Sequence, residues 1–189
     1  MRIVGGRMRG ARLAEVGVGD EAARLRPTSD RVRESLFNLL AHGGYAVPPP
    51  PLGMQVLDLF AGTGALGLEA LSRGAAEVVF VENGRAGLEL LRANVARLKA
   101  EGARVLERDA TRLGANDGTG FDLVFLDPPY GRGLGERAMA SALAGGWLAS
   151  GALVVWEESA TITPPAGLTL LDARRYGSTM ISVLRLSQS

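Results

Sequence analysis

The sequence predicts an α/β fold built on a doubly wound, mostly parallel sheet, and three observations support this prediction. Between residues 54 and 156, apolar runs of strand length alternate with amphipathic runs of helix length. A glycine-rich turn joins the first of these strands to the first of these helices. The last two apolar runs lie on either side of Tyr176 and Gly177, so we expect an antiparallel hairpin at one edge of the sheet.

The chain of 189 residues has the size of one α/β domain with a short appendage. The prolines at 48–51 divide it, because they cannot continue a helix and are typical of a stiff polyproline spacer. We therefore expect an arginine-rich N-terminal extension of residues 1–51 that contacts RNA, and a catalytic domain of residues 52–189.

The extension is predicted to contain a small β-hairpin followed by one helix. Residues 1–13 mix short apolar pairs with glycines, which favours a hairpin that carries arginines and projects from the core. Thr28, Ser29 and Asp30 offer caps for a helix, whose apolar residues then recur at helical spacing until His42.

The main domain is predicted to alternate strands with helices. The strands are expected at 54–60, 77–81, 104–106, 121–126, 153–156, 169–173 and 180–186, and the helices at 65–73, 85–100 and 136–144. In such folds, ligands bind beyond the carboxyl ends of the parallel strands, so the side chains at those positions are the candidate site residues.

The segment from Asp58 to Gly67 leaves the first of these strands and enters the first helix, where a nucleotide-like ligand meets a helix N-terminus. Its glycines also match the dinucleotide fingerprint, so the motif alone leaves a nicotinamide cofactor open. Asp58 stands at the strand end, where it could accept an amino-acid ammonium group, and this favours S-adenosylmethionine. The residues predicted to bind the cofactor along this segment are Asp58, Phe60, Ala61, Gly62, Thr63 and Gly64.

Two further acidic residues are predicted to hold the cofactor. Glu82 closes the second strand, where a bidentate acceptor for a ribose diol belongs, and Asn83 follows it. Asp109 is expected to end the third strand and, with Ala110, to contact the adenine edge, although Asp is also a common first residue of a turn.

The tetrapeptide Asp127-Pro128-Pro129-Tyr130 directly follows the apolar run 121–126 and is predicted to be catalytic. The two prolines stiffen the loop and offer no N–H, so the loop presents the Asp127 carboxylate and backbone carbonyls as acceptors, with the Tyr130 ring beside them. This set suits an exocyclic amino group on a flat base. Asp127 is also expected to contact the cofactor.

Arginines are concentrated at the N-terminal end of the chain, and this asymmetry is typical of a protein that binds a polyanion, although a merely soluble surface would look similar. The predicted RNA contacts are Arg2, Arg7, Arg9, Arg12, Arg26 and Arg31. Arg33 is a weaker candidate, because arginines on a helix face are usually only solvated. Tyr176 either lines the substrate groove or caps the edge strands.

Composition excludes several classes of site. The chain has no cysteine, hence no disulfide or thiolate site, and its one histidine, His42, cannot build a metal site alone. No apolar run approaches the roughly 20 residues needed to span a bilayer, and the N-terminus does not have the pattern of a signal peptide. We expect a cytoplasmic protein that binds no metal and no membrane.

Several separated segments resemble a known family. The Asp127–Tyr130 box and the Asp58–Gly67 loop are similar to those of class I methyltransferases, which are Rossmann-like proteins that modify exocyclic amines with S-adenosylmethionine. More narrowly, the chain resembles the bacterial RsmD family, which methylates the N2 amine of one guanine in small-subunit ribosomal RNA. The segments that carry this resemblance are 2–6, 26–34, 57–69 and 125–130.

The resemblance implies an S-adenosylmethionine-dependent rRNA (guanine-N2-)-methyltransferase whose partner is 16S rRNA, naked or within the assembling 30S subunit. We expect a monomer. Asn83-Gly84 after Glu82 is less typical of the family and alters the expected adenosine pocket. Three alternatives stay open at this point: an N6-adenine methyltransferase that acts on DNA or RNA, a non-catalytic RNA-binding protein, and a nicotinamide oxidoreductase.

Overall fold

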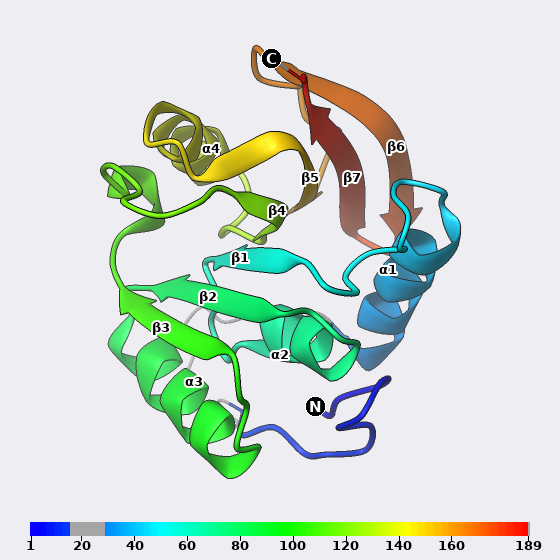
Figure 1. The fold of residues 1–189 in the computed structure, drawn as a ribbon, viewed down its shortest axis with the longest axis vertical. Helices are drawn as coiled ribbons and strands as arrows, with labels where there is room; N and C mark the ends of the chain where they lie inside the picture. Colours follow the sequence, from blue (N-terminus) through cyan, green and yellow to red (C-terminus); the bar gives the residue numbers. More distant parts are fainter. Residues whose placement is uncertain (16–28, 189) are drawn as a thin grey trace.

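The structure is a computed structural model that describes residues 1–15 and 29–188. Its centre is one seven-stranded sheet with the strand order β3-β2-β1-β4-β5-β7-β6 (Figure 1). The strands are β1 (Gln55–Leu59), β2 (Glu77–Glu82), β3 (Ala103–Glu107), β4 (Phe121–Leu126), β5 (Leu148–Glu158), β6 (Leu168–Tyr176) and β7 (Thr179–Leu186). The helices are α1 (Asp30–His42), α2 (Ala65–Ser72), α3 (Arg85–Arg97), α4 (Leu134–Ala144) and the short 3-10 helix η2 (Ala110–Arg112).

The sheet topology confirms the predicted fold class. Strands β1 to β5 are parallel, and β7 pairs antiparallel with both β5 and β6. The edge hairpin is therefore present, and its second strand, β7, is the one that joins the parallel part. The sheet changes from parallel to antiparallel pairing between β5 and β7. The neighbour of β5 on its other side is β4.

Helices cover both faces of the sheet, because alternate side chains of each strand point to opposite sides. On one face, Val56 and Phe80 belong to a core cluster with residues of α1, α2 and α3. On the other face, Leu57 and Val79 belong to a cluster with residues of α4 and η2. This is the doubly wound arrangement, and it buries the central strands on both sides.

Several element ends differ from the prediction by a few residues, and two of them have a clear physical cause. Helix α3 ends at Arg97 instead of residue 100, because Lys99 has a φ of 45° and cannot continue a right-handed helix. Strand β5 begins at Leu148 instead of residue 153, since Leu148 pairs with Phe121 although the intervening residues have weak strand preference. In the second case, tertiary pairing overrides local preference.

The N-terminal segment forms the hairpin only as one antiparallel bridge between Arg2 and Arg12, and the expectation that it projects from the core is wrong. Ile3 and Leu13 are buried in the core that α1 and α2 share. The backbone N–H of Arg7 donates a hydrogen bond of 2.8 Å to the carbonyl of Ser72 on α2. The segment lies against α2 because its apolar residues find a core there.

The prolines at 48–51 do not form the expected polyproline spacer. The N–H of Leu52 donates to the carbonyl of Pro49 at 3.2 Å, and the N–H of Met54 donates to the carbonyl of Pro51 at 3.1 Å. These bonds close turns, whereas a polyproline helix has no internal hydrogen bonds. The chain therefore folds back before β1. The division of the chain near residue 51 stays a prediction.

Candidate active site

The parallel strands β1, β2 and β4 end side by side at one edge of the sheet (Figure 1). Leu59 of β1 is in register with Val81 of β2 on one side and with Leu126 of β4 on the other. Glu82 and Asp127 each follow one of these partners by a single position. The predicted ribose acceptor and the predicted catalytic carboxylate therefore lie on either side of β1.

The turn after β1 is held by its own backbone and by Glu82. The N–H of Ala61 donates to the carbonyl of Val81 at 3.0 Å, and the N–H of Gly62 donates to Glu82 Oε2 at 2.7 Å. Gly62 and Gly64 have φ values of 54° and 81°, in the left-handed region that glycine enters without a steric penalty. The bare backbone beside a carboxylate fits a nucleoside-bearing cofactor at this position.

Two features of this turn were not predicted from the sequence. Phe60 has a φ of 61°, a strained value for a residue with a side chain, and such positions cluster at ligand sites. Asn94 of α3 is fully buried, and its Nδ2 donates to the carbonyl of Thr63 at 2.9 Å while its Oδ1 accepts the N–H of Ala14 at 2.7 Å. The sequence does contain a signal for this buried contact: Asn94 is a polar residue one turn after Leu91, on an otherwise apolar helix face.

Asp58 is fully buried in β1, and its Oδ2 accepts the N–H of Gly67 at 2.9 Å. The pKa of this carboxyl is raised to about 8, mainly by burial and also by the negative charges of Asp127 and Glu82, while the hydrogen bond from Gly67 lowers it. The group is therefore neutral below about pH 8 and ionises more readily beside a cation. The predicted contact with an ammonium group stays a prediction.

Glu82 uses both carboxylate oxygens to order the loop around it. Besides the Gly62 bond on Oε2, its Oε1 accepts the N–H groups of Asn83 at 2.9 Å and of Gly84 at 2.7 Å. A carboxylate offers about four acceptor positions, so capacity remains for ligand hydroxyls. The side chain is fixed in place before any ligand binds.

Asp109 does not end β3, which stops at Glu107; it instead caps the 3-10 helix η2. Its Oδ1 accepts the N–H and the hydroxyl of Thr111, each at 2.8 Å. Burial alone would raise the pKa of Asp109, but the Thr111 bonds and the nearby charges of Arg112 and Arg137 outweigh it and hold the pKa below its usual value. Ala110 beside it is buried. The adenine contact stays a prediction.

The predicted catalytic box begins directly after β4, which spans 121–126 as predicted. Pro128 is buried, Pro129 is exposed, and Asp127 and Tyr130 are partly buried. The Tyr130 hydroxyl lies 3.3 Å from the hydroxyl of Thr179, at the start of β7. Burial raises the pKa of Tyr130 to about 12, so the phenol stays neutral near pH 7.

The arginines predicted to contact RNA are mainly on the surface. Arg2, Arg7, Arg9, Arg12 and Arg31 are exposed, and Arg2 lies 3.6 Å from the carboxylate of Asp30. Arg26 lies outside the described residues. The exposed groups are available to a polyanion, and their contacts with RNA stay a prediction.

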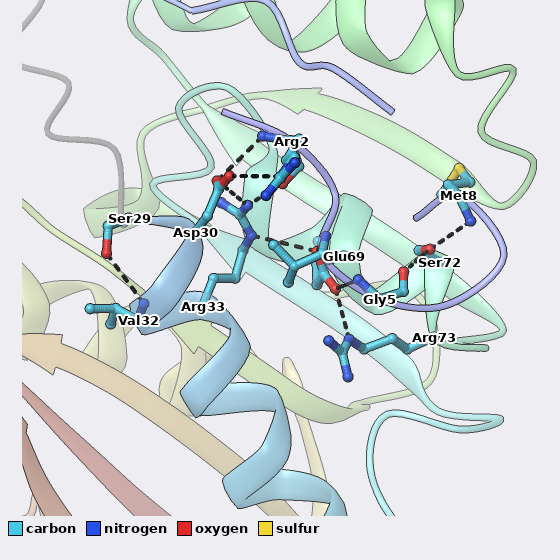
Figure 2. A network of polar contacts seen from close by, with 12 residues as sticks. Arg2, Gly5, Met8, Ser29, Asp30, Val32, Arg33, Glu69, Ser72 and Arg73 are labelled. Carbon is cyan, nitrogen blue, oxygen red and sulfur yellow. Dashed lines mark hydrogen bonds and ion pairs between the residues drawn. The ribbon is translucent and has the colours of Figure 1, made fainter. Parts of the chain in front are cut away.

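Arg33 is not a candidate for RNA binding, because its side chain is fully buried. Its Nη2 donates to Asp30 Oδ1 at 2.8 Å and to the carbonyl of Arg2, and its Nε lies 3.5 Å from Glu69 Oε2 (Figure 2). The helix periodicity could have revealed this, since Arg33 lies one turn before the buried residues Leu36 and Phe37.

Tyr176 ends β6 and lines a cavity together with Tyr130, and its contact with a substrate stays a prediction. Among residues 1–15 and 29–188, no group of three or more acidic or histidine side chains is placed to hold a metal ion. In the same residues, no helix is both long enough and apolar enough to cross a bilayer.

Fold and site together define a class I methyltransferase architecture, with a glycine turn after β1 and a box of acceptors after β4. The solved structure of TrmN from Thermus thermophilus shares this fold, with a TM-score of 0.66 at 24% identity over 88% of this chain and 52% of that one. A family model described as conserved hypothetical protein 95 matches residues 1–185. The chain belongs to this family, which is the RsmD family.

Relatives from bacteria are similar to this chain over most of their length. The chain is 44% identical to ribosomal RNA small subunit methyltransferase D of Escherichia coli strain K12, over 90% of this chain and 82% of that protein. The protein of the same name from Haemophilus influenzae is 36% identical, over 94% and 89%. The solved structure of the E. coli protein yhhF has a TM-score of 0.83 at 41% identity and covers 100% of this chain and 99% of that one.

Proposed function

We propose that this protein transfers a methyl group from S-adenosylmethionine to the exocyclic N2 amine of one guanine in 16S ribosomal RNA. The observation that carries the proposal is the position of Asp127-Pro128-Pro129-Tyr130. The box follows β4 at the same sheet edge as the glycine turn after β1, with Leu59 and Leu126 in register. The names of its relatives support methyl transfer to small-subunit ribosomal RNA.

The cofactor is held by the turn after β1 and by the carboxylates around it. Glu82 would accept hydrogen bonds from the ribose hydroxyls, the turn from Phe60 to Gly64 would bind the nucleoside, Asp58 would bind the ammonium group and Asp109 would bind the adenine. When bound, S-adenosylmethionine supplies a methyl group on a sulfonium, and the electrons of the broken C–S bond leave with the sulfur.

Asp127 and the carbonyl of Pro128 accept the two N–H bonds of the guanine amine. The nitrogen lone pair is delocalised into the ring, so orienting both hydrogens is what turns the nitrogen toward the methyl carbon. Tyr130 stacks on the base and remains a neutral phenol because its pKa is about 12. The proton lost from N2 passes to Asp127 or to water.

The decisive experiment gives the purified protein labelled S-adenosylmethionine with 16S rRNA, small subunits and duplex DNA as separate substrates. We expect label in RNA or in small subunits, at the N2 of one guanine that mass spectrometry of nuclease fragments identifies. Label on the N6 amine of adenine would instead indicate an N6-adenine methyltransferase. Failure to label any of the three, with cofactor binding intact, would support a non-catalytic RNA-binding protein.

The remaining expectations follow from this substrate. An enzyme that modifies 16S rRNA works in the cytoplasm, where small subunits assemble, and it needs neither a metal nor a membrane. We propose a monomer, because one chain contributes the glycine turn, the catalytic box and the exposed arginines. Light scattering on the purified protein measures the oligomeric state.

A further inference from the structure

A cavity of about 740 Å³ lies beside the catalytic box and is not accounted for by the target base alone. Its described walls come from three distant parts of the chain: the first turns of α1, the loop after β4, and the turn between β6 and β7. The lining residues on which the inference depends are Arg31, Ser35, Tyr130, Arg175, Tyr176 and Thr179.

Tyr130 connects this cavity to the reaction site. It is the last residue of the predicted catalytic box, and its hydroxyl lies 3.3 Å from that of Thr179, which also lines the cavity. A base held by the box is therefore at one end of the cavity. Whatever is covalently attached to that base extends along the remaining walls.

The charges of the cavity differ from those around the box. Among the described lining residues, Arg31 and Arg175 are cationic and none is acidic. Both arginines are exposed, and no ion pair holds either of them within the described part of the chain. The acids that act on Tyr130, among them Asp127 and Glu157, belong to the strand ends instead. Acceptors thus face the reactive amine, while cations face the space beyond it.

The cavity also carries groups that recognise a base and a sugar. Tyr176 is partly buried and presents an aromatic ring, and Ser35 and Thr179 present hydroxyls. An aromatic ring next to two guanidinium groups is the set that proteins use to bind single-stranded nucleic acid, because rings stack on bases and arginines contact phosphates.

We propose that this cavity binds the nucleotides adjacent to the target guanine, with Arg31 and Arg175 on backbone phosphates and Tyr176 on the neighbouring base. The inference rests on the proposed function, and it adds how the RNA substrate presents the target nucleotide to the protein. The volume is within the range of about 300 to 1,000 Å³ for small-ligand sites, which admits about one or two nucleotides and no duplex. The target is therefore presented in an unpaired or extruded segment.

The phosphate contacts are tested with the double variant Arg31→Gln/Arg175→Gln and with Arg174→Gln as its matched control. Arg174 is adjacent on β6 and equally exposed, but it lies 3.0 Å from Asp172 and does not line the cavity. We expect the double variant to raise the KM for RNA about tenfold at 0.15 M salt, and to reduce the slope of log affinity against log salt by about 1.4. The control is expected to leave both unchanged.

The stacking contact is tested with Tyr176→Ala and Tyr176→Phe. Loss of the ring is expected to lower kcat/KM for RNA by about 5- to 100-fold, whereas the phenylalanine variant keeps the ring and stays close to the wild type. Calorimetric binding of S-adenosylmethionine and the unfolding midpoint are measured for every variant. Both should match the wild type, since neither the glycine turn nor Glu82 lines this cavity.

The outcomes separate this inference from the proposed function. If the wild type methylates neither 16S rRNA nor small subunits, the proposed function fails. If the wild type is active and the double variant keeps its KM and salt slope, the adjacent-nucleotide site alone is overturned. Should the double variant not fold, the two single variants are measured instead, each with an expected slope change of about 0.7.

Discussion

Arg33 Nε lies 3.5 Å from Glu69 Oε2, and both side chains are fully buried. Glu69 also accepts the N–H groups of Val4 and Gly5, each at 2.8 Å, and the Nε of Arg73 at 2.7 Å (Figure 2). A single carboxylate of α2 therefore holds α1 and the N-terminal segment together. Both of these elements carry exposed arginines that are proposed to contact RNA.

Replacing Glu69 with Leu is expected to lower the free energy of unfolding by about 3 to 5 kcal/mol, because it leaves buried guanidinium and backbone N–H groups without their acceptor. Urea denaturation measures the change. Glu89→Ala removes a carboxylate from an exposed pair with Arg85 and should cost less than about 0.5 kcal/mol. A loss below about 1 kcal/mol for Glu69→Leu would mean that the network does not hold these elements.

Replacing Asp127 with Ala is expected to lower kcat by about 100-fold or more, since an oriented acceptor of the reactive amine is lost. Single-turnover methyl transfer measures this step. Cofactor affinity by calorimetry should change little, because the turn after β1 and Glu82 remain. Unchanged turnover in this variant would contradict the mechanism. Asp122→Ala, at the start of β4 and far along the strand from the box, is the matched carboxylate control.

Cofactor affinity is expected to rise with pH up to about pH 8. Asp58 has a pKa raised to about 8 by burial, so below that pH it holds a proton that a neighbouring cation of the cofactor displaces. Affinity then increases by at most about tenfold per pH unit and is constant above pH 8. Calorimetry from pH 6 to 9, in buffers of different ionisation enthalpy, measures affinity and proton release together.

The isosteric variant Asp58→Asn keeps an acceptor for the Gly67 N–H but cannot release a proton. Its affinity should therefore not vary with pH over this range. A wild type whose affinity is also constant would show that Asp58 does not face a cation. The stability of the free protein is expected to change with pH in the opposite direction. The folded state keeps a proton that the unfolded chain loses near about pH 4, so the Asp58 contribution to stability falls between about pH 4 and pH 8.

Replacing Gly67 with Ala is expected to destabilise the fold by about 1 to 3 kcal/mol and to weaken cofactor binding. A Cβ there would come within 2.3 Å of the Phe80 ring and 2.9 Å of Asp58 Oδ2, so the start of α2 must move. Thermal unfolding and calorimetry measure the two effects. Gly118→Ala, whose Cβ would meet only Asn116 at 3.5 Å, should change neither quantity.

The sequence predicts the parts of the site that depend on local patterns. Strand β4 and the box after it were placed correctly because an apolar run, two prolines and an aromatic residue determine their local structure together. The glycine turn and Glu82 were placed correctly for a similar reason, since parallel strands joined by helices end at the same sheet edge.

The parts that were missed depend on contacts between distant residues. Nothing near Val4 indicates that its N–H is bonded to Glu69, which is 65 positions away, so the N-terminal segment was expected to project. Arg33 was considered for RNA binding because two of the partners that hold it, Arg2 and Glu69, come from other parts of the chain. Asp109 is a local exception: it was placed at a strand end, whereas its hydrogen bonds to Thr111 make it a helix cap.

The strand order places β7 between β5 and β6, so β6 joins the sheet only through β7, the last strand in the sequence. The turn that is proposed to bind the nucleoside uses only strands that precede β5 in the sequence. During synthesis, the elements of the proposed donor pocket are therefore made first, whereas the cavity wall with Arg175 and Tyr176 joins the sheet only after β7, the last strand, has been made.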